Sequence, residues 1–302
     1  MSLVNRSTQA LLRGFKLGAI IGTLVVLAAC NATRLAYNNA PQLAWWWLDG
    51  YIDFSREHAP RAKDALAQLL SWHRQTQLND YAVFVATVGK QMTEPVTAAQ
   101  VCTWFAQARV LAQPSVEQAA TVALDLLPTL GAAQLAHLEQ RLAKANADYR
   151  KERMSDDPDE RVKQRVKRGV DSTERIYGSV EEPQRRILEA AAKASVFNAP
   201  AQLAEREQRQ KAIVQVLRSW LAQPPERAAA KASIAQWVEH AEHSPDPIYR
   251  VVQQRQSEMN CRLNAEVHNS TSPAQRVAAR KQFKEWEDDL RALASAKLSG
   301  QR

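Results

Sequence analysis

Hydrophobic side chains recur every three or four positions along most of the chain from Pro41 onward, which is the spacing of one face of an α-helix. Leu66, Leu69 and Leu70 share one such face. Only residues 81–88 are also compatible with a strand. The pattern therefore predicts an all-α protein built as a multi-helix array or bundle.

The longest continuous pattern predicts a helical hairpin at about residues 130–178. Leu135, Leu138 and Leu142 line one charged helix, Val162 and Val166 continue the pattern, and the acidic stretch 156–159 between them predicts the turn. Further helices are predicted at about 183–197, 202–222, 226–243, 246–268 and 273–298.

Capping boxes, in which a hydroxyl residue precedes a glutamine by three positions, predict three helix starts. They are Thr97 with Gln100, Ser115 with Gln118 and Ser272 with Gln275. Gly131 with Gln134 and Glu181 with Gln184 keep the glutamine and lack the hydroxyl.

The N-terminus predicts export. Three basic residues precede a thirteen-residue, mostly apolar run, Leu17 to Ala29, which is shorter than the roughly 20 residues of a membrane-spanning helix. The run ends in Leu27-Ala28-Ala29-Cys30, which matches the bacterial lipobox. We expect cleavage before Cys30 and lipidation of its thiol. The alternative is an uncleaved anchor helix with an incidental cysteine.

This interpretation divides the chain into a signal peptide at 1–29, a lipidated tether at 30–40 and a helical domain at 41–302. In the sorting rule of many Gram-negative lipoproteins, Asp after the lipidated cysteine retains the protein in the inner membrane. Asn31 therefore favours the outer membrane, with the protein facing the periplasm.

Export also changes the net charge of the mature protein and the partners that this charge suggests. The formal charge of the whole chain is +8, and loss of the three basic signal residues leaves 37 basic and 32 acidic side chains. Nucleic acid is not an expected partner outside the cytoplasm. The membrane, reached through the N-terminal lipid, and an envelope protein or cell-wall polymer are the expected partners.

Three consecutive tryptophans, Trp45, Trp46 and Trp47, follow the tether. Neighbours on a helix are turned by about 100°, so the three cannot share one face. At least one must point away from a single core stripe. The open alternatives are contact with a membrane or partner, and a first helix that other helices surround.

Cys102 and Cys261 are the remaining cysteines of the exported chain. An even pair in an oxidising compartment predicts a disulfide, and the alternative is two separate buried thiols.

Catalytic motifs are missing from the sequence. It contains no G-x-S-x-G, no H-E-x-x-H, no phosphate-loop glycine pattern and no C-x-x-C. We predict no catalytic residue, no metal and no cofactor. His240 and His243 could ligate a metal from adjacent turns, but they also suit the C-terminal end of a helix dipole.

Two charged groups are candidates for other chemistry. The carboxylates Asp49, Asp53 and Glu57 would share a helix face if that helix continues, which is the arrangement an enzyme would need.

The basic residues of 161–168 either contact anionic head groups or glycans, or form a solvated face. They are Arg161, Lys163, Arg165, Lys167 and Arg168.

Several segments resemble a family of proteobacterial lipoproteins catalogued as a domain of unknown function. They are Arg34 to Pro41, Trp46 to Asp53, Trp72 to Arg74, Gln100 to Trp104 and His268 to Arg276. The resemblance implies an outer-membrane or periplasmic lipoprotein with no established activity. Val96 to Gln100 also resembles the L-T-x-x-Q boxes of small periplasmic chaperones.

Together these features predict a lipid-anchored envelope protein acting as a non-enzymatic interaction or chaperone-like module at the periplasmic face of the outer membrane. The alternative is a glycan- or lipid-acting envelope enzyme.

Overall fold

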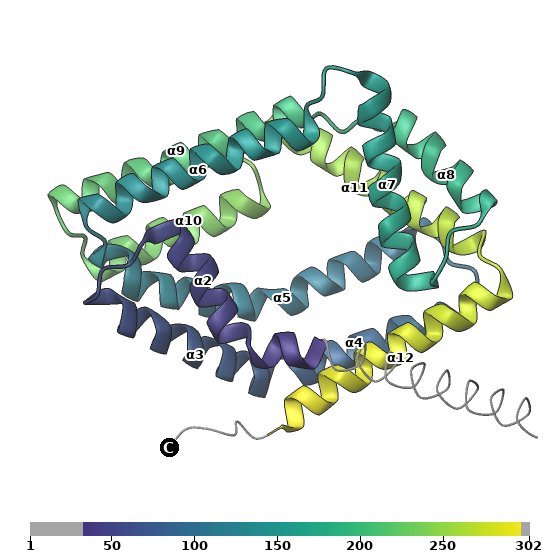
Figure 1. Cartoon of the computed structure of the whole chain (residues 1–302), viewed down its shortest axis with the longest axis horizontal. Coiled ribbons are helices and arrows are strands. Elements are labelled where there is room, and N and C mark those ends of the chain that lie inside the picture. Colours follow the sequence, from purple (N-terminus) through teal and green to yellow (C-terminus); the bar gives the residue numbers. More distant parts are fainter. Residues whose placement is uncertain (1–32, 297–302) are drawn as a thin grey trace, which may run out of the picture.

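The computed structural model describes residues 33–296, and every regular element in this range is a helix (Figure 1). This confirms the predicted all-α, multi-helix arrangement. In chain order the elements are α2 (Ala40–Ile52), α3 (His58–Thr76), α4 (Leu78–Gln91), α5 (Ala98–Leu126), the short 3-10 helix η1 (Leu127–Thr129), α6 (Ala132–Arg153), α7 (Pro158–Tyr177), α8 (Glu182–Lys193), α9 (Ala199–Ala222), α10 (Arg227–Glu242), α11 (Pro247–Asn269) and α12 (Pro273–Ser295).

Two of the three predicted capping boxes begin helices. The side chains of Thr97 and Ser272 accept from the third helical amide, and the matching glutamines accept from the cap amides. The box predicted at Ser115 is wrong, because α5 runs without a break through Pro114. The hydroxyl of Ser115 instead lies 2.9 Å from that of Tyr81, so it joins α5 to α4.

The predicted hairpin is wrong in its packing, although its two helices and the turn between them are present. α6 packs along α9, and α7 packs against α8 and α12 (Figure 1). Asp157 caps α7, and the guanidinium of Arg161 donates to the carbonyl of Ser155 at 2.6 Å. Residues 154–157 therefore form a corner that sends the two helices to different neighbours.

The buried apolar side chains form two main cores at opposite ends of α5. The first core joins α5 to α2, α6, α9 and α10, and its buried members are Ile52, Leu124, Leu130, Leu135, Leu138, Val214, Leu217, Trp220, Ala230 and Ile234. The second core joins α4, α7, α8, α11 and α12, and its buried members are Val88, Met92, Tyr177, Leu188, Val267 and Ala279. The long helix α5 thus connects two separately packed regions.

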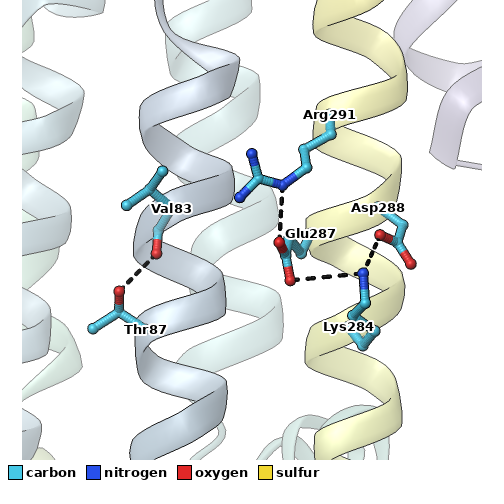
Figure 2. A network of polar contacts seen from close by, with 6 residues as sticks. All are labelled: Val83, Thr87, Lys284, Glu287, Asp288 and Arg291. Atoms are coloured by element: carbon cyan, nitrogen blue, oxygen red, sulfur yellow. Dashed lines mark hydrogen bonds and ion pairs between the residues drawn. The ribbon is translucent and has the colours of Figure 1, made fainter.

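The pairing of α4 with α12 depends on apolar contact. A Cβ atom placed on Gly89 would lie 2.8 Å from the Cβ of Phe283, so only glycine permits this close approach. Figure 2 shows the polar contacts on the same two helices. Lys284 and Arg291 pair with Glu287 on α12, while Thr87 donates to the carbonyl of Val83 on α4. Each of these contacts stays within one helix and adds nothing across the pair.

The folded body begins before Pro41, the boundary predicted from the sequence. Residues 33–38 are helical. Arg34 pairs with Asp289 of α12 at 2.6 Å, and Tyr37 bonds to Nδ1 of His73 at 2.7 Å. Hydrogen bonds to α3 and α12 thus hold a segment that composition alone assigned to the tether. Among the described residues, none of the helices has the length and apolarity needed to cross a membrane.

Candidate functional site

The most exposed apolar surface near the N-terminus lies on residues 33–50. We define the aromatic face as four exposed residues: Leu35 (64% exposed), Leu43 (46%), Trp46 (62%) and Trp47 (66%). Trp46 and Trp47 come from the same turn of α2, and the ring of Trp47 lies 4.9 Å from that of Tyr51. Two large indole rings are therefore held in solvent on an ordered helix.

Trp45 explains why its neighbours are exposed. Trp45 is buried and stacks on Phe54, with 5.6 Å between the ring centroids. The ammonium group of Lys63 lies over the Trp45 ring, 4.6 Å from its centroid. Because Trp45 fixes the inward side of α2, the 100° turn per residue directs Trp46 and Trp47 outward. The expectation that the three tryptophans cannot share one core face is confirmed.

The aromatic face has no charged side chain of its own, and the guanidinium of Arg141 lies near Trp47, 5.5 Å from the ring of Tyr51. Asp49 is the only ionisable carboxylate or base in α2, and its carboxylate accepts from the amide of Phe54 at 3.1 Å beyond the helix end. The exposed members of α2 beside the face are Gln42 and Gly50. An uncharged indole surface of this kind suits a membrane interface or an apolar partner surface.

Cys30 and the lipobox residues Leu27, Ala28 and Ala29 lie outside the described residues. Three peptide bonds separate Cys30 from Thr33, so the two residues can lie no more than about 11 Å apart. The aromatic face therefore begins close to the residue that the sequence predicts to be lipidated.

Cys102 and Cys261 are joined by a disulfide bond with 5.3 Å between their Cα atoms. The bridge links α5 to α11, and Cys261 is almost fully buried beside Val96, Val101 and Ala265.

The three carboxylates considered for an enzyme do not share a helix face. α2 ends at Ile52, and Asp53 adopts a left-handed conformation (φ 56°) as the residue that caps the helix. Glu57 then lies before α3 and is exposed. The condition for the carboxylate cluster, that the helix continues, is not met because the chain turns at Asp53.

The histidines considered for a metal end α10. Nδ1 of His243 lies 3.2 Å from the carboxylate of Glu239, one turn earlier. Within residues 33–296, His, Cys, Asp and Glu side chains do not gather in groups of three suited to a metal.

The basic segment of α7 divides into two groups. Lys163 and Lys167 are exposed, as a solvated face predicts. Arg165 and Arg168 are half-buried and line a hollow beside α8 and α11. Burial and the neighbouring charges of Arg153 and Arg165 lower the pKa of Arg168.

One group of buried polar residues was missed by sequence reasoning, although its segment carries the family resemblance. Residues 268–276, the clasp, connect α11 to α12 and bond to two other loops. Nε2 of His268 lies 2.9 Å from the carbonyl of Glu94, which only accepts, so this nitrogen carries the proton and Nδ1 accepts from Tyr177. Gln275 donates to the carbonyl of Ser179, in the turn after α7.

Burial shifts the pKa of both members of this pair. It lowers the pKa of His268 below its usual 6.5 and raises that of Tyr177. His73 shows the same lowering of its pKa from burial. Both histidines are therefore held neutral at pH 7.

Comparisons with known proteins give one match. A family model described as a family of unknown function, DUF6279, matches residues 50–229. Neither the curated proteins nor the solved structures contain a match to the chain. The matched segment runs from the end of α2 into α10 and covers more than half of the chain. The protein is therefore a member of the DUF6279 family, whose function is unknown.

Proposed function

We propose that this protein is a lipid-anchored, non-enzymatic cell-envelope protein that lies against the membrane through its aromatic face. The observation that carries the proposal is the exposure of Trp46 and Trp47 on α2, a helix whose one carboxylate is Asp49 and which begins ten residues after Cys30. Indole rings are stabilised at the boundary between head groups and acyl chains, where one end meets apolar and the other polar surroundings.

The order of the features along the chain supports the membrane over a soluble partner. A lipid on Cys30 would hold residues 33–50 near the bilayer surface, and several acyl chains bind stably where one does not. Arg34 and Tyr37 fix the first helical residues to α12 and α3, so the aromatic face cannot move far from the helical body. The membrane would then orient the whole molecule. The outer membrane, facing the periplasm, follows from Asn31.

The remaining body would act as an interaction module for an envelope protein or cell-wall polymer. The disulfide between Cys102 and Cys261 is consistent with an oxidising compartment.

Lipidation is tested by replacing Cys30 with Ser. The variant should lose acyl labelling and accumulate as the precursor. Normal labelling or normal processing would contradict the anchor.

The aromatic face is tested with the acylated protein in vesicles that contain brominated lipids, which quench nearby tryptophans. Replacing Trp46 and Trp47 with Phe should remove most of the quenched emission, because the other six tryptophans lie outside the face. Trp220→Phe is the matched control, since Trp220 lies in the first core. Its loss should leave the quenched fraction unchanged. Equal quenching in the double variant and the control would contradict contact between the face and the membrane.

A further inference from the structure

The second core borders a cavity of about 410 Å³ between α4, α5, α7, α11 and α12, which opens to solvent beside Phe105 and Ala108. Its walls are mainly apolar and include Phe84, Val88, Met92, Trp104, Ile176 and Phe283. Among the residues that the structure describes, no Asp, Glu, Lys or Arg lines it. Its size falls within the range of about 300–1,000 Å³ that is typical of small-molecule sites.

Most of the polar side chains in the wall already have partners. Thr173 donates to the carbonyl of Gly169, and the indole N–H of Trp104 donates to Gln91. The hydroxyl of Tyr177 donates to Nδ1 of His268. The cavity thus offers little to a polar ligand and suits an aliphatic chain.

A second hollow of about 490 Å³ adjoins the cavity and differs from it in carrying positive charge. Arg153, Arg165 and Arg168 line it, and no carboxylate from the described part of the chain does. Within residues 33–296, none of the three forms an ion pair with a carboxylate. The exposed Glu152 raises the pKa of Arg168, but burial and the charges of Arg153 and Arg165, which lower it, are larger influences.

The two hollows share three wall residues, Gly169, Leu188 and Leu263. The wall is thin where Leu188 packs on Gly169, since a Cβ atom on Gly169 would lie 2.8 Å from Cδ2 of Leu188. The side chain of Leu188 therefore lies between the arginines and the apolar cavity.

We propose that the two hollows form one binding site for an anionic, single-chain amphiphile. Its aliphatic chain occupies the cavity of the second core, and its phosphate or carboxylate head group binds Arg153, Arg165 and Arg168. Charge complementarity selects this occupant, because three clustered guanidinium groups without a carboxylate partner are stabilised by an anion. The site is separate from the aromatic face and does not require lipidation of Cys30.

The binding test uses dodecyl phosphate and dodecanoate, each below its micelle concentration, with the neutral monododecanoyl glycerol as the comparison probe. Calorimetry of the protein should show binding of at least one anionic probe and at least about tenfold weaker binding of the neutral one. Preference for phosphate would indicate a phospholipid-derived ligand, and preference for carboxylate a fatty acid. Equal binding of the neutral probe, or binding of none of the three, would overturn the proposal.

Two pairs of variants locate the site. Arg168→Glu should weaken binding of the anionic probe by about 10- to 100-fold, whereas Lys167→Glu, the same charge change on an exposed neighbour, should leave it within about twofold. Ala108→Trp fills the cavity mouth from an exposed position of α5 and should weaken binding at least about tenfold. Ala106→Trp, exposed elsewhere on α5, is its control.

Circular dichroism and thermal melting show whether each variant folds. Two further outcomes would overturn the proposal. One is equal binding by Arg168→Glu and Lys167→Glu. The other is weakened binding in a variant with Trp46 and Trp47 replaced by Ser, since this would place the amphiphile on the aromatic face.

Discussion

The two cores of the molecule differ in what fills them. The first core is packed with large side chains, including Trp220, whose ring lies 5.7 Å from that of Trp237. The second core surrounds a cavity of about 410 Å³. Around this second core the structure adds connections that the first lacks, namely the disulfide of Cys102 with Cys261 and the clasp at residues 268–276.

The difference suggests how a hollow region keeps its shape. Unfilled volume removes dispersion contacts from the side chains that line it. Buried hydrogen bonds supply directional contacts in their place, and Thr173, Gln184, His268, Thr271 and Gln275 are all buried around the second core. The helices of the first core are joined by close packing and by exposed ion pairs, such as Arg218 with Glu139 and Arg227 with Asp125. The helices of the second core are joined by buried hydrogen bonds and a disulfide, and they border an open site.

The largest expected effect is in the first core. Leu217 and Leu188 are equally buried, at 4% and 5% exposure, but only Leu188 borders the cavity. Leu217→Ala should lower the free energy of unfolding by about 4 kcal/mol, near the upper end for such changes. Leu188→Ala should cost about 2 kcal/mol, because its side chain has fewer partner atoms to lose. Urea unfolding followed by circular dichroism measures both. A larger loss at Leu188 would contradict the contrast in packing.

Removing the disulfide comes next. Replacing Cys102 and Cys261 together with Ala should lower the free energy of unfolding by about 2–4 kcal/mol, because the bridge closes a long loop. The loss of stability should be confined to the second core. Hydrogen exchange should therefore accelerate in α11 and in the N-terminal half of α5, and stay unchanged in α6 and α9. Equal acceleration in all four helices would show that the two regions unfold as one unit.

A matched pair of glutamines tests the clasp. Gln184 and Gln134 both accept from the amide that caps their own helix, α8 and α6 respectively. Gln184 is fully buried and also donates to the carbonyl of Ser270. Gln184→Leu should cost about 1–3 kcal/mol of stability, since it leaves buried groups without partners. Gln134→Leu, at a partly solvated site, should cost less than about 1 kcal/mol. Equal costs, measured by urea unfolding, would mean that the clasp does not stabilise the second core.

The smallest effect is on pH dependence. Burial lowers the pKa of His268 in the folded state, so between the folded pKa and the usual value near 6.5 the unfolded chain binds more protons. Stability is then complete above about pH 6.5 and falls as the pH drops below it, by up to about 1.4 kcal/mol for each pH unit. His268→Gln should flatten this slope in urea titrations from pH 7 to pH 5. His73→Gln should flatten it less, because His73 is less buried. An unchanged slope in His268→Gln would contradict a neutral, buried imidazole.

Local signals explain which features the sequence predicted. Helix positions followed from apolar spacing and capping residues, because both act within a few residues of the helix end. The Ser115 box failed because the same spacing occurs inside α5, where Pro114 did not end the helix. Its hydroxyl found a partner in Tyr81, 34 residues away in the chain.

Features that depend on which helices meet could not be predicted. The apolar stripe of α6 suits any helix with a matching stripe, so the sequence did not favour α9 over α7 as its partner. The outward direction of Trp46 and Trp47 became definite only once Trp45 was seen against Phe54. The cavity is formed by unequal packing of helices from both halves of the chain, and no single segment encodes it.

The contrast between a filled and a hollow core is tested most directly by xenon, which binds in apolar cavities. Crystals of the protein should be pressurised with the gas and the bound atoms located by their anomalous scattering. We expect xenon beside Val88, Ile176 and Phe283 in the second core, with the region around Leu217 and Trp220 unoccupied. Xenon bound within the first core, or none bound in the second, would contradict the account.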